Sequence, residues 1–294
     1  MNLMKYKLFY FVFSMLLILP GLYFLLTSGL KLGIDFTGGA LLEYKFEKSL
    51  DKNELREVVE KNGVEVGQIN DSGDKTYIIR TKPLDQEKIK EIKKSLNDNF
   101  GKLEERREEF VGPVIGSEVS QKAIYALALA SLMIVLYITF SFRKVPKPAS
   151  SFRFGIAAIV ALLHDVLLVI GVFAILGKFL GVEVDTLFVT ALLTIIGFSV
   201  HDTIVVFDRI RENFLKNLGG KFETVANISV TQTLARSLNT SLTVVFVLVA
   251  LLLFGGETIK WFVVALLVGI ISGTYSSIFN ATALLVWWEE KLGH

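Results

Sequence analysis

The sequence predicts an all-α membrane bundle of six transmembrane helices, with an α+β domain inserted after the first helix. The 294 residues are 52% hydrophobic and their mean hydropathy is +0.54. A soluble domain of this length rarely reaches such a content. The apolar residues are gathered in runs of the length that crosses a bilayer as a helix, and one long charged stretch separates the first run from the second.

The first span, within residues 1–29, follows the short leader MNLMKYK. Its apolar run is too long for a cleaved signal peptide, so we expect an uncleaved anchor. The five later spans lie within residues 121–294, and the last is long enough to tilt. We place the six spans near residues 8–28, 124–142, 154–176, 186–207, 234–254 and 261–288.

The charged stretch, residues 30–120, predicts a ferredoxin-like domain. Strands are expected at 39–47, 64–70, 76–81 and 102–111, and helices at 51–63 and 85–101, where Asp51 and Asp85 precede the apolar periodicity. The order βαββαβ is that of the split-βαβ fold. This stretch has neither His nor Cys, so we expect no enzyme active site in it.

Basic residues predict the orientation in the membrane. With the N-terminus inside, the inner short segments hold most of the Lys and Arg, including Arg143, Lys144 and Lys147. We therefore expect both termini in the cytoplasm and residues 30–120 outside. The net charge of only +2 gives no support to nucleic-acid binding.

Two spans contain the dipeptide His-Asp, at His164-Asp165 and His201-Asp202. An ionisable side chain in the hydrocarbon costs on the order of 3 kcal/mol, so such residues are usually functional. Adjacent residues on a helix point about 100° apart, which sends His201 and Asp202 toward different neighbours. The same divergence argues against a metal site built from these pairs.

The fifth span offers a counter-charge for Asp202. Arg236, Thr240 and Thr243 recur at helical spacing, and Arg236 lies near the same end of its span as Asp202. If Arg236 moves relative to Asp202, the carboxylate can switch between protonated and ionised forms, which is a proton relay. A static buried pair that only fixes packing is the alternative, and the histidines and Asp165 could equally be satisfied interior groups.

Residues 208–233 leave the membrane between the fourth and fifth spans. Charged and apolar residues alternate there at helical spacing, which predicts an amphipathic helix lying at the inner interface. An ordinary positively charged loop would account for most of its charge.

Four motifs in order resemble the SecD/SecF family of protein-export membrane subunits, on its SecF side because the outer segment is short. They are GIDFTGG (Gly33, Asp35, Phe36, Gly38, Gly39), HDV in the third span, DTIVVFDRIREN (Asp202 to Asn213, with Asp208, Arg209, Arg211 and Glu212) and RSLNTSLT. The GIDFTGG glycines also have a structural explanation, since they can bend the chain from span to strand.

The resemblance implies that the chain works with SecD, beside the SecYEG channel, on a translocating polypeptide, and is not an enzyme. It implies protons as the coupling ion, no cofactor and no metal. The family links Asp202 and Arg236 to proton transport; we expect Ser199, Thr240 and Thr243 to line the route, with Asp165 and His201 as secondary candidates. His201 departs from the family, which commonly has Asn at this position.

Two other functions stay open from the sequence. The chain could be half of a proton-driven exporter of small molecules or lipids from the same resistance–nodulation–division superfamily, although its compact insert argues against a large ligand cleft. It could also be a structural assembly subunit without proton flux. In each case the protein contacts membrane lipid along its spans.

Overall fold

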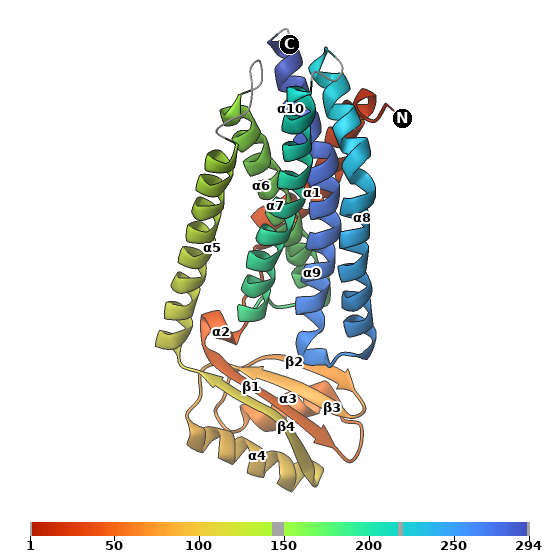
Figure 1. Ribbon diagram of the computed structural model, residues 1–294. Coiled ribbons are helices and arrows are strands. Elements are labelled where there is room, and N and C mark those ends of the chain that lie inside the picture. Colours follow the sequence, from red (N-terminus) through yellow and green to blue (C-terminus); the bar gives the residue numbers. More distant parts are fainter. Residues whose placement is uncertain (1, 143–149, 217–219, 293–294) are drawn as a thin grey trace. The chain divides into compact units, whose positions relative to one another are not determined.

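The computed structural model describes residues 2–142, 150–216 and 220–292. Arg143, Lys144 and Lys147 lie outside these residues. The chain divides into two compact units: the first comprises Met1–Lys31 and Tyr125–His294, and the second is Leu32–Ile124 (Figure 1).

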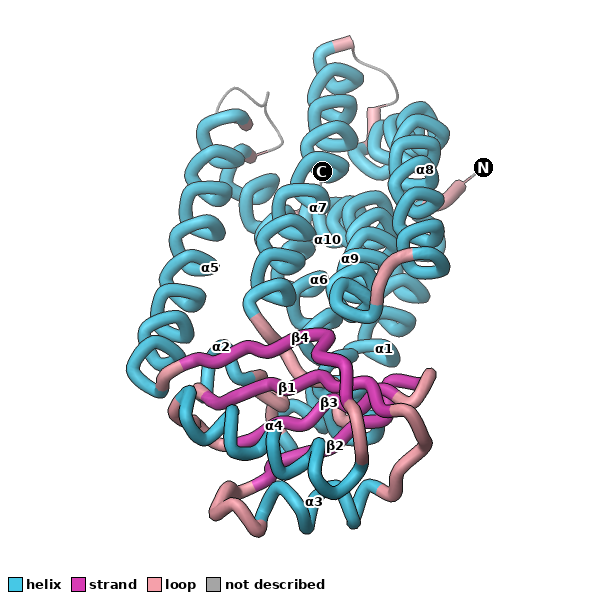
Figure 2. The backbone as a smooth tube through the Cα atoms, turned by 90° about the horizontal axis from the view of Figure 1, so that it is seen from below, coloured by secondary structure: helices cyan, strands magenta, loops and turns pink. Residues whose placement is uncertain are grey.

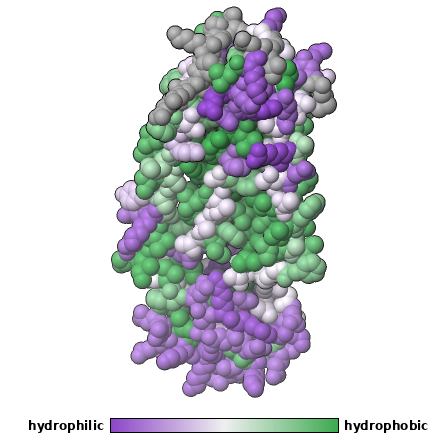
Figure 3. Space-filling model, viewed as in Figure 1, coloured by the Kyte–Doolittle hydropathy of each residue, from purple (hydrophilic) through white to green (hydrophobic). Residues whose placement is uncertain are grey.

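The first unit is helical. Six helices of the described chain are long and apolar enough to cross a membrane, which confirms the predicted multi-pass architecture. Figure 3 shows mostly apolar side chains over these helices. After a short turn η1 (Met4–Tyr6), the helices are α1 (Lys7–Ser28), α5 (Pro113–Ser141), α6 (Ser151–Leu180), α7 (Thr186–Leu215), α8 (Phe222–Phe254), and a last span of α9 (Glu257–Tyr275), the π-helical η2 (Ser276–Asn280) and α10 (Ala281–Lys291).

The inner helices are α6, α7 and the last span. Their apolar windows have 44%, 50% and 61% of residues buried, against 17%, 6% and 17% for α1, α5 and α8. Glycines bring the inner helices close to their neighbours. A Cβ on Gly21 of α1 would lie 2.7 Å from Gly171 Cα of α6, and a Cβ on Gly269 of α9 would lie 2.3 Å from Ile195 Cδ1 of α7.

Residues 208–233, where the sequence predicts an amphipathic helix at the inner interface, do not form a separate helix in the described chain. Helix α7 continues to Leu215, and α8 begins at Phe222. The two ends pack side by side, because Asn213 Nδ2 donates to Ser229 Oγ at 2.8 Å and the rings of Phe214 and Phe222 lie 5.0 Å apart. The motif residues of this end form ion pairs along α7, between Arg209 and Glu212 and between Arg211 and Asp208.

The second unit has the predicted βαββαβ order. After a short helix α2 (Ile34–Thr37), its elements are β1 (Gly39–Phe46), α3 (Lys52–Glu60), β2 (Val66–Gly73), β3 (Thr76–Thr81), α4 (Gln86–Phe100) and β4 (Leu103–Val111). The four strands form an antiparallel sheet in the order β2-β3-β1-β4. Figure 2 shows α3 and α4 together on one face of this sheet.

Alternation along the strands builds the core of this unit. Ala40, Leu42, Tyr44 and Phe46 of β1 are all buried and pack with the apolar faces of α3 and α4. Asp51 caps α3 by accepting from the backbone nitrogen of Asn53 at 2.7 Å. Asp85 stands at the N-cap of α4, but its side chain makes no capping hydrogen bond.

Candidate functional site

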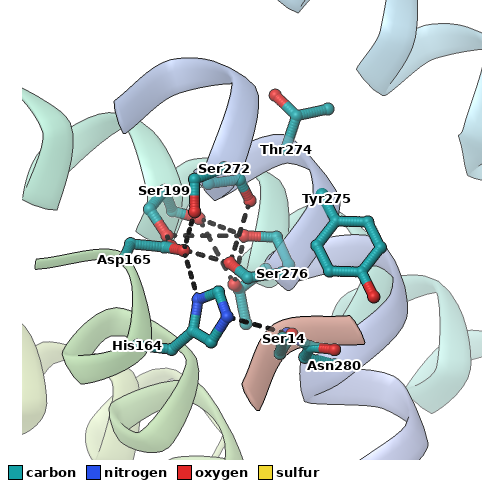
Figure 4. A network of polar contacts seen from close by, with 12 residues as sticks. Ser14, His164, Asp165, Ser199, Ser272, Thr274, Tyr275, Ser276 and Asn280 are labelled. Carbon is teal, nitrogen blue, oxygen red and sulfur yellow. Dashed lines mark hydrogen bonds and ion pairs between the residues drawn. The ribbon is translucent and has the colours of Figure 1, made fainter. Parts of the chain in front are cut away.

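Asp165 of α6 lies at the centre of a buried polar network (Figure 4). Its side chain is 1% exposed. Ser199 of α7 donates to Asp165 Oδ2 at 2.5 Å, Ser276 of η2 donates to the same oxygen at 2.7 Å, and Ser272 of α9 donates to Oδ1 at 3.1 Å. Three hydroxyl groups from two other spans therefore stabilise one intramembrane carboxylate.

The neighbouring imidazole links this carboxylate to the first span. His164 Nδ1 lies 2.9 Å from Asp165 Oδ1, and His164 Nε2 lies 3.3 Å from Asn280 Nδ2, which also donates to Ser14 Oγ at 2.6 Å. An amide nitrogen only donates, so Nε2 accepts and Nδ1 carries the hydrogen that points at Asp165. The polar chain thus runs from α6 through the last span to α1.

The π-helical segment η2 supplies several members of this network. Ser276, Ser277 and Asn280 are all buried. Ser277 Oγ donates to the backbone oxygen of Ser199 at 2.8 Å and accepts from Thr203 Oγ1 at 2.9 Å. Local π-helical turns within α-helices occur often at functional sites, and this one turns three polar side chains toward the inner helices.

Asp202 of α7 lies in a different environment. Its side chain is 2% exposed, yet its Oδ2 atom has no hydrogen-bond partner. The hydroxyl groups of Ser237 and Ser241 on α8 are next to the carboxylate, and Ser241 Oγ is also 2.6 Å from Thr274 Oγ1. A buried carboxylate oxygen without a partner is costly when it is charged, and protonation relieves that cost.

The structure does not pair Asp202 with Arg236, which is exposed and forms no ion pair with it. Thr240 and Thr243 are also exposed, and their hydroxyls donate to backbone oxygens of α8 itself. Ser199, expected on the Asp202 route, belongs to the Asp165 network instead. Within this chain the predicted route is therefore not assembled.

A shift of one residue along α8 explains why the observed neighbours of Asp202 differ from the predicted ones. Ser237 and Ser241 are spaced by four and share the buried face, whereas Arg236 and Thr240 precede them by one residue and point about 100° away. Ser237 and Ser241, the serines of RSLNTSLT, have the same i, i+4 spacing as Arg236 and Thr240. Placing the partners of Asp202 on the serine face of α8 would have identified them from the sequence.

Polar residues also form an exposed stripe along α7. Thr190, Thr194, Gly197 and His201 are all exposed at helical spacing, so His201 and the buried Asp202 point in different directions. Polar groups within transmembrane helices almost always face protein or water-filled cavities. This face of α7, with the exposed Arg236, Thr240 and Thr243 of α8, is therefore unsuited to lipid contact.

The GIDFTGG residues belong to the other unit and take no part in either carboxylate environment. Gly33, Gly38 and Gly39 are buried, while Asp35 and Phe36 are partly exposed on α2. Throughout the part of the chain that the structure describes, no three His, Asp or Glu side chains are placed to hold a metal ion.

Six candidate spans that hold the buried aspartates Asp165 and Asp202, interrupted by a ferredoxin-like domain, define a multi-pass membrane protein of the transporter class. Two family models match the chain: "Protein export membrane protein SecD/SecF, C-terminal" over residues 91–291 and "SecD/SecF GG Motif" over residues 23–49. The chain belongs to the SecD/SecF family.

Relatives and solved structures agree with this assignment. The chain is 50% identical to the protein translocase subunit SecF of Thermobaculum terrenum, over 99% of this chain and 94% of that one. It is 36% identical to SecDF of Bacillus subtilis, over 96% of this chain and 37% of that one. The crystal structure of SecDF, a translocon-associated membrane protein from Thermus thermophilus, superposes with a TM-score of 0.87 and 33% identity, covering 99% of this chain and 39% of that chain.

Proposed function

We propose that the chain is a SecF subunit that uses the proton-motive force, together with SecD, to assist translocation and release of polypeptides at the outer face of the SecYEG channel. The family and the 50% identity to a SecF subunit support the export role. The observation that carries the proton role is Asp202, a buried carboxylate in a membrane span whose Oδ2 has no hydrogen-bond partner.

The two intramembrane aspartates differ in the way this role requires. A proton carrier needs a carboxylate oxygen that is open to a proton, whereas oxygens already occupied by fixed hydrogen-bond donors serve to hold helices together. Asp165 has three hydroxyl donors and the His164 ring on its oxygens. Asp202 has a free oxygen, so we assign proton carriage to Asp202 and helix packing to Asp165.

The exposed polar stripes on α7 and α8 support association with SecD. In the SecDF relatives this chain covers 37% and 39% of one longer chain, which carries both parts in a single polypeptide. In this proposal SecD covers His201, Arg236 and Thr240, and the uncovered surface contacts membrane lipid. Arg236 then lies at the interface between SecD and this chain. A movement of the two subunits relative to each other changes the distance between Arg236 and Asp202.

The orientation follows the positive-inside rule, with both termini in the cytoplasm and residues 30–120 outside. Ion pairs connect the helix ends that this orientation places on the inner side of the membrane. Lys7 at the start of α1 pairs with Glu290 of α10, and Arg153 at the start of α6 pairs with the buried Glu289. These contacts support placing the start of α1 and the end of α10 on one side.

The test is export driven by the proton-motive force in membranes that contain SecD, SecYEG and this chain. We expect Asp202→Asn to abolish the stimulation, and Asp202→Glu to retain part of it because a protonatable group remains. Arg236→Met should reduce the stimulation without unfolding the chain, since Arg236 is exposed in it. Unchanged export in Asp202→Asn would remove the proton role while leaving the SecF assignment in place.

A further inference from the structure

The two ring nitrogens of His164 have different partners, and only one of them has room for another proton. Nδ1 carries a hydrogen that points at Asp165 Oδ1, 2.9 Å away. Nε2 carries none and lies 3.3 Å from Asn280 Nδ2. A neutral imidazole binds a second hydrogen at its free nitrogen and then has two donors and a positive charge. Nε2 is therefore the atom at which a proton can bind.

The carboxyl group beside the ring can balance the charge of an imidazolium. A charge inside a membrane protein needs a counter-charge in contact with it. The Asp165 side chain is 1% exposed and the His164 side chain is 10% exposed, so both lie within the helix bundle. A proton bound at Nε2 turns their 2.9 Å contact into a charge-assisted hydrogen bond.

The other ionisable side chains in the buried parts of the neighbouring helices have partners elsewhere. The hydroxyl groups of Tyr10 on α1 and Tyr275 on α9 both donate to backbone oxygens at 3.0 Å. On α10, Glu289 pairs with Arg153, and on α7 the carboxylate of Asp202 is next to serines of α8. Within the described chain, the ring therefore meets one carboxylate, that of the next residue.

The amide of Asn280 is held on one side only. Its Nδ2 donates to Ser14 Oγ at 2.6 Å and points at the His164 ring, whereas its Oδ1 is buried without a hydrogen-bond partner. Buried polar atoms normally have a partner that fixes them. Since nothing holds Oδ1, the amide can turn over and exchange its oxygen for its nitrogen. Asn280 can thus present either a donor or an acceptor to the ring.

The turned amide matches the protonated ring. Oδ1 then occupies the place of Nδ2, where it accepts from Nε2–H of His164 and from the hydroxyl of Ser14. The separation of 2.6 Å at Ser14 suits this arrangement, because O–H···O bonds span about 2.5–3.0 Å. Ser14, whose hydroxyl also neighbours that of Tyr275, changes from accepting to donating. The charge of the ring is thereby felt on α1.

We propose that His164 is a proton-binding site of the membrane spans, separate from Asp202, and that the Asn280 amide turns over when the proton binds. In the neutral state Asn280 donates to the ring and to Ser14, and in the charged state it accepts from both. The π-helical segment η2 holds this amide between α6 and α1 (Figure 4). The site does not require that Asp202 carries the proton that drives export.

Nitrogen-15 NMR of the purified chain in lipid bilayers tests the proton site, since a ring nitrogen with a hydrogen differs in chemical shift from one without. The chain has three histidines, and the signal missing from His164→Asn identifies His164. Histidines ordinarily change charge between about pH 8 and pH 5. Over this interval we expect Nε2 to gain a hydrogen while Nδ1 keeps its own. A ring with the same hydrogens throughout would overturn the proposal.

The side-chain amide signals test the turning of Asn280, whose signal is identified with Asn280→Ala. It should shift at the same pH as the ring. Asn213 is the matched control, because it is also buried with a partnerless Oδ1, but its Nδ2 donates to Ser229 and Gln232, which do not titrate. We expect its signal to stay constant. A ring that titrates beside an unchanged Asn280 signal would refute the amide switch, and loss of the ring titration in Asp202→Asn would refute a separate site.

Discussion

Replacing Asp165 with Asn tests the different roles that we propose for the two intramembrane aspartates, Asp165 in helix packing and Asp202 in proton carriage. The carboxylate accepts from Ser199 and Ser276 on one oxygen and from Ser272 on the other, which also faces the His164 ring. An amide keeps only one acceptor oxygen. Whichever way it turns, two of these partners then face an NH2 group.

The magnitude follows from the hydrogen bonds that the amide cannot accept. Interhelical hydrogen bonds in membrane proteins contribute about 0.6 kcal/mol on average and up to about 1.7 kcal/mol. Removing two of them therefore predicts that Asp165→Asn lowers the free energy of unfolding by about 1–3 kcal/mol. Asp202→Asn loses no hydrogen bond at Oδ2 and removes a buried charge, so we expect it to cost no stability.

The assay is unfolding of the purified chain in mixed micelles, by titration with sodium dodecyl sulfate, for the parent and both variants. The Ser199→Ala variant is a further check, because it removes one donor and should cost less than Asp165→Asn. If Asp202→Asn were the more destabilising of the two aspartate variants, the division of roles between them would be refuted.

Three further predictions concern other parts of the chain. Gly171→Ala should weaken the contact of α6 with α1 and lower stability, whereas Gly197→Ala on α7, where a Cβ meets nothing within 4 Å, should be tolerated; the same titration measures both. Ser241→Ala should lower stimulated export with little loss of secondary structure by circular dichroism, because it removes a hydroxyl beside Asp202. Burial raises the pKa of Tyr44 well above the ordinary tyrosine value, so the unfolded chain releases this proton at about pH 10 while the folded domain keeps it, and the domain should lose protease resistance as pH rises above about 10. Tyr44→Phe should reduce that dependence.

Periodicity and hydropathy predicted the architecture because each signal is local. Alternation along 39–47 and the aspartates that precede the two helices, Asp51 and Asp85, mark the elements of the inserted domain, whose fold the structure confirms. Hydropathy predicted the membrane-spanning segments but not the residues at which their helices begin and end. Helix α5 starts at Pro113 and α8 at Phe222, because both helices continue beyond their apolar cores on polar turns.

The site was harder to predict because it depends on the rotation of helices and on contacts between them. A rotation of one residue on α8 exchanges Arg236 for Ser237 at the buried face. The network around Asp165 needs residues from three spans and a π-helical turn, which no spacing in the sequence shows. The polar stripe of α7 is exposed in the described chain, and no spacing in the sequence shows which face of a helix its neighbours leave uncovered.

We propose that Asp202 carries the proton that drives export. The most direct measurement compares the parent and Asp202→Asn in vesicles with SecD and SecYEG, following polypeptide translocation before and after a proton gradient is imposed. We predict that the gradient accelerates translocation in the parent and has no effect in Asp202→Asn. Equal acceleration in both would contradict the claim.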